Sequence, residues 1–165
     1  MQLCSSGILL STRIPLLRCC SSSAPCLFKV GDTLKLTRTF TNEDVMEYGK
    51  VTFDSNPLHF DSDSARNAGF EDRLVQRMLV ATLFPWIISS HFPGAVYVSQ
   101  SLHFKLPVYI GEEIFGEIEA DNIRENKNSY IAKLKTRCFK NGGLLVLDGE
   151  AITILSSLVV AQVHP

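Results

Sequence analysis

The spacing of apolar residues divides the chain into a first half that favours helices and a second half that favours strands. Apolar side chains fall nearly all round the segment from Leu74 to about Ser90, which predicts a buried central helix. Pro85 is expected to kink that helix, because proline lacks an N–H and its ring clashes with the preceding turn. From Ala95 onward apolar residues recur at every second position, as they do in strands. The predicted strands are Ala95–Phe104, Glu112–Arg124, Tyr130–Phe139 and Leu144–Leu155.

Two further elements are predicted ahead of the central helix. Residues Asp32–Phe40 are the first strand candidate, and Thr41 is placed to cap a helix that follows it. Turn signals at Asn126–Asn128 and Asn141–Gly143 separate the last three strands. A strand and a helix, then one long helix and consecutive antiparallel strands, predict an α+β fold in which an antiparallel sheet wraps around a central helix.

The candidate chemistry lies in a short polar loop ahead of the central helix. Asp54 and His59 are separated by five positions, and Asn56-Pro57 stands between them. Proline restricts its own φ and disfavours helix at the residue before it, so this backbone is stiffer than a glycine–serine loop. A carboxylate and an imidazole in fixed relation suit general acid–base catalysis, to which a positioned group contributes about 10²–10⁴-fold.

An alternative interpretation of the same residues is an ordinary turn. Asp, Ser, Asn and Pro are all common in turns. Asp61 or Ser62 is placed to cap a short helix through Ala65–Ala68, with Gly69 ending it. The loop pattern alone therefore leaves both interpretations open.

Composition limits the classes to which the chain can belong. Its 165 residues, 45% of them hydrophobic, suit one globular domain with a sizeable core. The formal net charge of −1 gives no reason to expect nucleic-acid binding, and no apolar run reaches the roughly 20 residues of a membrane helix. Cys and His do not have the spacing of a zinc site. We therefore expect a soluble protein with no metal, no nucleic-acid partner and no membrane partner.

The first 31 residues differ in composition from the rest. They are Ser-rich, they contain Arg13, Arg18 and Lys29, and no acidic residue precedes Asp32. This composition is typical of a transit peptide, whereas a secretory signal needs a continuous apolar run of about 7–15 residues. We predict a mitochondrial transit peptide over residues 1–25. A plastid destination and an ordinary disordered terminus are the alternatives.

Cysteine usage agrees with an organellar destination. Four of the five cysteines lie near the amino terminus: Cys4, Cys19, Cys20 and Cys26. The predicted domain, residues 28–157, contains Cys138 alone, so it has no disulfide framework and fits a reducing compartment such as the mitochondrial matrix. Cys138 lies in an alternating strand pattern, which favours a small buried hydrophobe over a nucleophile. Residues 158–165 are predicted to be a tail.

Motifs along the chain resemble those of one known family. They are Asp54-Ser55-Asn56-Pro57-Leu58-His59, Leu74-Val75-Gln76-Arg77-Met78-Leu79-Val80 and Leu102-His103-Phe104-Lys105-Leu106-Pro107-Val108-Tyr109-Ile110-Gly111. In that order and spacing, the chain from about Phe28 to Leu155 resembles the MaoC-like (R)-specific hydratases, and among them the mitochondrial 3-hydroxyacyl-[acyl-carrier-protein] dehydratases of plants. The resemblance implies a single hotdog domain that pairs into homodimers and uses no cofactor.

The resemblance also implies roles for individual residues. Asp54 and His59 match the family's catalytic pair, and Asn56-Pro57 matches its substrate-binding loop. Where the family reads Val-His-Gly-Met-Leu, this chain reads Val-Gln-Arg-Met-Leu from residue 75. The family binds the thioester carbonyl through the N–H of that glycine. The N–H of Arg77, together with that of Met78, is therefore expected to take this role.

The implied activity is that of an (R)-3-hydroxyacyl-[acyl-carrier-protein] dehydratase of mitochondrial fatty-acid synthesis. Syn elimination of water from a 3-hydroxyacyl thioester would give the trans-2-enoyl thioester, with an acyl-carrier protein or CoA as the carrier. One alternative is an (R)-specific enoyl-CoA hydratase that uses the same residues in reverse. Another is a hotdog that binds acyl thioesters without turning them over, which the change to Gln76-Arg77 suggests.

Three cations are predicted to share one face of a strand: Lys133, Lys135 and Arg137. A solvated sheet face accounts for them without any function, since exposed strands commonly carry alternating charges. The alternative is a docking surface for an acidic carrier protein or for a nucleotide phosphate of CoA.

Overall fold

A computed structural model describes residues 26–161 of the chain. The predicted transit peptide and the last four residues of the predicted tail lie outside the described residues. The elements are β1 (Thr33–Thr39), α1 (Asn42–Thr52), η1 (Pro57–His59), α2 (Ser62–Asn67), α3 (Arg77–Ala81), α4 (Leu83–His91), β2 (Val96–Gln100), β3 (His103–Phe104), β4 (Glu113–Asn126), β5 (Ser129–Lys140), η2 (Asn141–Gly143) and β6 (Leu144–Leu155).

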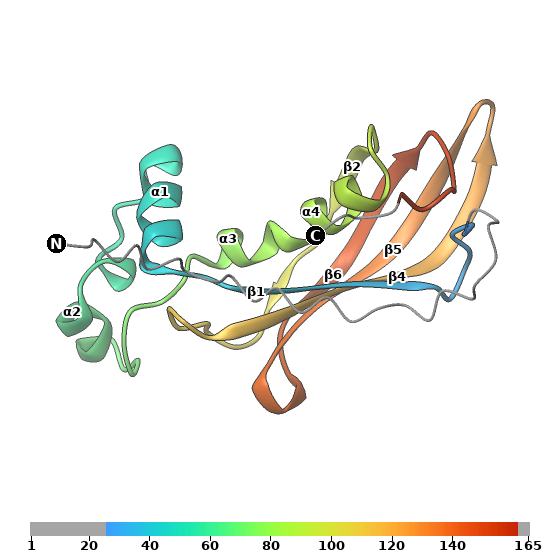
Figure 1. The fold of residues 1–165 in the computed structure, drawn as a ribbon. Helices are drawn as coiled ribbons and strands as arrows, with labels where there is room; N and C mark the ends of the chain where they lie inside the picture. Colours follow the sequence, from blue (N-terminus) through green and yellow to red (C-terminus); the bar gives the residue numbers. More distant parts are fainter. Residues whose placement is uncertain (1–25, 162–165) are drawn as a thin grey trace, which may run out of the picture.

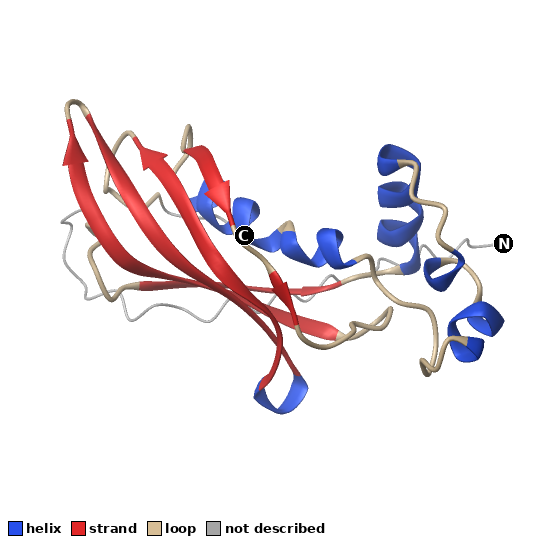
Figure 2. Ribbon diagram, turned by 180° about the vertical axis from the view of Figure 1, so that it is seen from behind, coloured by secondary structure: helices blue, strands red, loops and turns tan. Residues whose placement is uncertain are grey.

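The strands form one antiparallel sheet in the order β1-β4-β5-β6-β2, and the short β3 pairs with β6 beside β2. The sheet curves around α4, while α1 and α2 lie together beyond one end of it (Figure 1). From behind, the long strands cross one face of the central helices (Figure 2). This is the predicted hotdog arrangement, with the α1–α2 region extending away from the sheet.

The core lies between α4 and the inner face of the sheet. Leu83, Phe84, Ile87 and Ile88 of α4 are at most 1% exposed. Each buried aliphatic or aromatic side chain of this size contributes about 1.5–3 kcal/mol through removal from water. At Gly116 of β4 an added Cβ would lie 3.2 Å from Leu83 and Ile87, so glycine lets the helix approach the strand. The predicted buried central helix is confirmed in this segment.

The predicted helix from Leu74 to Ser90 and its kink at Pro85 need correction. Leu74 forms a β-bridge with Tyr109, Val75 lies outside the helices, and the helical part is divided into α3 and α4 at Thr82. A proline ring clashes with the carbonyl four residues earlier, which here belongs to Ala81, the last residue of α3. The break therefore lies ahead of Pro85, which occupies the first turn of α4, where its missing N–H costs little.

The predicted strand Ala95–Phe104 is also divided, into β2 and β3. A register shift between Tyr97 and Ser99 bends β2, and the strand ends before Ser101. The backbone of Ser101 passes so close to β6 that a Cβ at Gly149 would lie 1.9 Å from the Ser101 carbonyl oxygen. The chain therefore leaves the regular ladder at this point. The other predicted strands agree with the structure to within a few residues.

Helix α1 starts and ends as its sequence predicts, and it leads the chain into the polar loop. The Thr41 hydroxyl accepts from the Asp44 N–H at 3.2 Å, and the Asp44 carboxylate accepts from the Thr41 N–H at 2.8 Å. This capping box satisfies two otherwise unpaired amides. At the other end Phe53 adopts a left-handed conformation with φ 58°, which turns the chain sharply just before Asp54.

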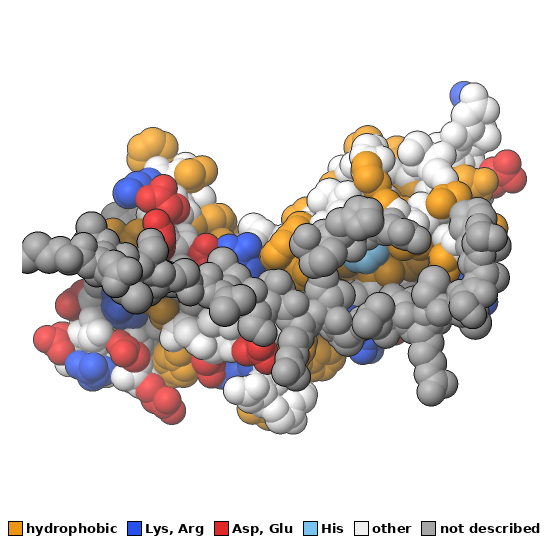
Figure 3. All heavy atoms as spheres, in the orientation of Figure 1, with side chains coloured by type: hydrophobic (Ala, Val, Ile, Leu, Met, Phe, Trp, Pro, Cys, Tyr) orange, Lys and Arg blue, Asp and Glu red, His pale blue; other side chains and the backbone are white. Residues whose placement is uncertain are grey.

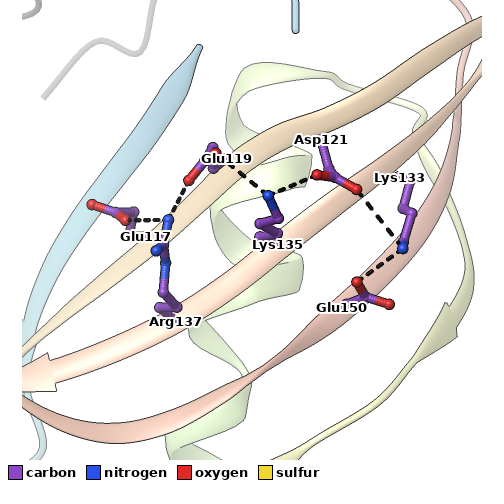
Figure 4. A network of polar contacts seen from close by, with 7 residues as sticks. All are labelled: Glu117, Glu119, Asp121, Lys133, Lys135, Arg137 and Glu150. Carbon is purple, nitrogen blue, oxygen red and sulfur yellow. Dashed lines mark hydrogen bonds and ion pairs between the residues drawn. The ribbon is translucent and has the colours of Figure 1, made fainter. Parts of the chain in front are cut away.

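The cations predicted on one strand face are all paired with carboxylates. On the outer face of the sheet, Glu117, Glu119, Asp121 and Glu150 alternate with Lys133, Lys135 and Arg137 in one network (Figure 4). Lys135 lies 2.7 Å from Asp121, and Lys133 lies 2.9 Å from Glu150. Hydrogen bonding to Lys135 lowers the pKa of Asp121, and hydrogen bonding to Glu150 raises the pKa of Lys133. Glu117 also lies 2.7 Å from Lys35, so four carboxylates face four cations. This local balance favours a solvated sheet face over a docking surface for an acidic partner.

Across residues 26–161, none of the helices combines the length and the apolar character needed to cross a membrane.

Candidate active site

The polar loop lies between α1 and α2 and carries its own turn. The Asn56 side chain accepts from the Leu58 N–H at 3.2 Å, and Pro57 occupies the first position of η1. Asp61 then caps α2 by accepting from the Ser64 N–H at 2.8 Å. The turn interpretation is thus correct for the second part of this segment, and it does not compete with a site at Asp54 and His59.

His59 is held in one tautomer by a backbone carbonyl. Its Nδ1 lies 2.8 Å from the carbonyl oxygen of Leu74. Because a carbonyl oxygen only accepts hydrogen bonds, Nδ1 carries the proton and donates it. In the neutral imidazole, Nε2 then has a free lone pair. The ring is largely buried, with 11% of the side chain exposed.

Asp54 faces the free nitrogen of His59. Its Oδ2 lies 3.7 Å from Nε2 of His59, and its Oδ1 accepts from the Asn56 N–H at 3.0 Å. A gap of 3.7 Å is longer than a direct hydrogen bond. The two groups therefore face each other without forming a hydrogen bond, and each keeps this atom free for another partner. Acid–base pairs often have this loose geometry before substrate binds. The structure thus brings the predicted pair together.

Leu74 connects this pair to the rest of the domain. Its N–H donates to the Leu58 carbonyl at 3.0 Å, while its own carbonyl holds His59. On the other side Leu74 forms an antiparallel bridge with Tyr109, and the Val75 N–H donates to the Val108 carbonyl at 2.8 Å. The Leu74 contact was not predictable from the sequence, because a backbone carbonyl acts independently of its side chain. Tyr109 and Val108 belong to the motif that carried the resemblance.

The two residues that depart from the family motif have different environments. Gln76 is 3% exposed, and its Nε2 donates to the Val45 carbonyl at 3.1 Å, which ties the start of α3 to α1. Its Oε1 has no hydrogen-bond partner among the described residues. The Arg77 guanidinium carbon lies 5.5 Å from the centre of the Phe104 ring, so the side chain is directed toward β3.

The predicted thioester donors are the backbone amides at the start of α3. Arg77 is the first residue of the helix, and its backbone conformation is helical, so glycine is not required for φ. The N–H groups of Arg77 and Met78 have no acceptor within residues 26–161. A small cavity of about 10 Å³ lies beside Arg77 and is otherwise lined by apolar side chains, among them Val80 and Phe104.

An open groove of about 460 Å³ runs along α1 toward the central helices. It is lined by Thr41, Glu43, Asp44, Glu47, Tyr48, Val51 and Leu79. In Figure 3 the surface is hollowed between the part formed by α1 and α2 and the part formed by the sheet and α4. The hollow lies between α1, which leads into Asp54, and α3, which begins at Arg77.

Cys138 and His103 make no contact with Asp54 or His59. Cys138 is buried, and burial raises the pKa of its thiol to about 12, so it is not a thiolate at neutral pH. The prediction of a small buried hydrophobe is confirmed. His103 is an exposed residue on β3, with its Nδ1 3.4 Å from Asp148.

A curved antiparallel sheet around a central helix defines a hotdog protein, and the acid–imidazole pair on its polar loop is a candidate acid–base site. The chain belongs to the MaoC-like domain family, whose model matches residues 28–137. It is 61% identical over 140 residues, 85% of each chain, to 3-hydroxyacyl-[acyl-carrier-protein] dehydratase FERN, mitochondrial, of Solanum lycopersicum. It is 59% identical over 146 residues, 88% of each chain, to the mitochondrial 3-hydroxyacyl-[acyl-carrier-protein] dehydratase of Arabidopsis thaliana.

A solved structure gives the same result for the fold. The (R)-hydratase from A. caviae involved in PHA biosynthesis superimposes with a TM-score of 0.72 at 38% identity, over 76% of this chain and 96% of that one. The predicted family and the predicted hotdog fold are therefore confirmed.

Proposed function

We propose that the chain is a lyase that dehydrates (R)-3-hydroxyacyl thioesters carried by an acyl-carrier protein. The observation that supports this most directly is the geometry of His59: Leu74 fixes the tautomer that leaves Nε2 unprotonated, and Nε2 faces Asp54. The identity to dehydratases over 85% and 88% of the chain supports the substrate class. The pair is the proposed catalytic site.

The chemistry of elimination matches two such groups. One group removes a proton from Cα, the C–O bond at Cβ breaks as the double bond forms, and the departing hydroxide takes a proton and leaves as water. Neutral His59 offers a lone pair at Nε2 for one proton transfer, and Asp54 is placed to take part in the other. In the reverse direction the same two groups would position and deprotonate a water molecule.

The developing negative charge on the thioester oxygen requires a donor. The unengaged N–H groups of Arg77 and Met78 are the proposed donors, three and four residues beyond the Leu74 carbonyl that holds His59. Asn56 and Pro57 shape the loop through the Asn56 cap, and their proposed role is to keep Asp54 and His59 at the bound thioester.

The reverse activity, hydration of enoyl thioesters, uses the same groups, and a related solved structure is an (R)-hydratase. The test is therefore run in both directions. Purified residues 26–165 are mixed with crotonyl-CoA, and loss of the enoyl absorbance is followed; (R)-3-hydroxybutyryl carrier-protein thioester is assayed for the opposite change. Turnover of the (R) isomer, with no turnover of the (S) isomer, is expected. Binding of both thioesters without turnover would contradict the enzymatic proposal and leave a binding role.

We also propose that two copies pair through the edge of the sheet. β2 ends the strand order, and its Val96 and Val98 are each 56% exposed. An apolar edge strand with free backbone groups is suited to pairing with a second copy. Light scattering is expected to give the mass of a dimer for the wild type and of a monomer for Val98→Lys, because a charged edge opposes pairing. A monomeric wild type, or a dimeric variant, would refute this interface.

The proposed location is the mitochondrial matrix. The Arg- and Ser-rich, acid-free composition of the first 31 residues supports it, as do two relatives whose names include "mitochondrial". Residues 1–31 fused to a fluorescent reporter are expected to direct it to the matrix, and Arg13→Glu with Arg18→Glu to prevent import. A wild-type fusion found in the cytosol, in plastids or in the secretory pathway would refute the assignment.

A further inference from the structure

The loop between β3 and β4 is held by Lys140, the last residue of β5. Lys140 donates to the carbonyl of Pro107 at 3.0 Å and to the two carboxylate oxygens of Glu112 at 3.2 and 3.3 Å. Its ammonium also lies 5.5 Å from the centre of the Tyr109 ring. The side chain is 14% exposed, so these partners largely replace water around the charge.

Glu112 holds the same loop through its side chain and through its backbone. Its carboxylate accepts from the Tyr109 N–H at 2.7 Å, and its own N–H donates to the Tyr109 carbonyl at 3.1 Å. Lys140 therefore anchors Glu112, and Glu112 holds the backbone of Tyr109. A largely buried, charge-assisted contact of this kind is stronger and more directional than an exposed ion pair.

The clasped loop in turn holds the segment that orients His59. The Tyr109 hydroxyl accepts from the Glu71 N–H at 3.2 Å, and the Tyr109 backbone pairs with Leu74. One residue further, the Val75 N–H donates to Val108. Residues 71–75 belong to neither a helix nor a named strand. These contacts therefore help to hold them in place, together with the bond from the Leu74 N–H to the Leu58 carbonyl and the burial of Leu74 and Val75.

We propose that Lys140, Glu112 and Tyr109 are positioning residues for His59. They act through the Leu74 carbonyl, which keeps the proton of His59 on Nδ1 and directs Nε2 toward Asp54. The inference rests on the proposed function in assigning a catalytic consequence to this orientation. The orientation itself is a property of the ligand-free protein and is measurable without turnover.

The test is Lys140→Met, which removes the charge and keeps the length of the stem. We expect kcat to fall about tenfold with KM within about twofold, because a displaced catalytic group costs rate more than binding. In long-range proton–nitrogen NMR spectra of the ligand-free protein, the signature of Nδ1-protonated His59 in the wild type should give way to a mixture of tautomers. The matched control is Lys133→Met, which removes a lysine paired with Asp121 and Glu150 on the same strand and should leave both readouts unchanged.

Tyr109→Phe is the second variant, since it removes only the acceptor of the Glu71 N–H and keeps the ring in place. If Lys140→Met does not fold, Tyr109→Phe tests the proposal instead. It is expected to give a mixture of His59 tautomers as well, with a smaller loss of kcat. An unchanged His59 signature in a folded variant would overturn the proposal. If the wild type turns over no thioester, the proposed function fails, while the His59 signature still shows whether this network orients the ring.

Discussion

Asp54→Asn and His59→Ala are each expected to lower turnover of the thioester on the order of 10²-fold or more. Asn keeps the shape of Asp54 and the acceptor for the Asn56 N–H, but it cannot take or give the proton. Ala at position 59 removes the lone pair of Nε2 that faces Asp54. Steady-state hydration of crotonyl-CoA by wild type and variants measures both losses.

The control for this prediction is a substitution that keeps the local structure of the loop. Because His59 is largely buried and donates to Leu74, His59→Ala also removes a structural hydrogen bond. His59→Gln retains an N–H that can reach the Leu74 carbonyl but has no basic nitrogen. Both variants should therefore be inactive, and His59→Gln should melt closer to the wild type. Near-full turnover by a folded His59→Gln variant would show that the acid–base assignment is wrong.

The elements that the sequence predicted well are those whose signal is local. The cap at Thr41, the strand β6 and the turn at residues 141–143 depend on residues next to one another in the chain. Alternation of apolar and polar side chains places Ala132, Leu134, Thr136 and Cys138 on the inner face of β5, and burial confirms it. Such patterns follow from strand geometry alone.

The elements that were predicted less well depend on contacts between distant segments. The backbone approach of Ser101 to Gly149 divides a strand whose sequence reads as continuous. The pairing of residues 74 and 75 with the loop before β4 removes them from a helix that their apolar character favours. Tertiary pairing overrides local propensity in both places.

The candidate site likewise contains residues with a local sequence signal and residues that act through contacts between distant segments. Asp54 and His59 were predictable, because their residue types and spacing indicate chemistry. Leu74 and Lys140 were not predictable. Leu74 acts through its backbone carbonyl, and Lys140 acts through contacts with residues that are distant in the sequence. The resemblance to a family supplied the candidate donors at Arg77 and Met78, which no pattern of residue types would have indicated.

Gln76→His combined with Arg77→Gly, which restores the Val-His-Gly-Met-Leu of the family, is expected to raise kcat/KM by at least tenfold. A helical Cα–Cβ bond tilts toward the amino terminus of its helix, which is also the direction of the unengaged N–H groups of α3. The stem of Arg77 therefore leaves the helix on the same side as the proposed donors of the thioester oxygen. A wholly misplaced donor costs about 10²–10³-fold, which is the upper bound of the gain.

The position of Arg77 over Phe104 limits how far the native chain is impaired. An exposed cation–π contact contributes about 0.5–1 kcal/mol, so a bound thioester could displace the guanidinium at small cost. The native chain should accordingly retain measurable turnover. Arg77→Ala is the matched control, because it removes the stem and keeps the Cβ, and its gain should be smaller than that of the double variant. Kinetics of the three proteins on one enoyl thioester decide the question: equal, substantial rates would show that glycine is dispensable at position 77, and inactivity of all three would support a binding role.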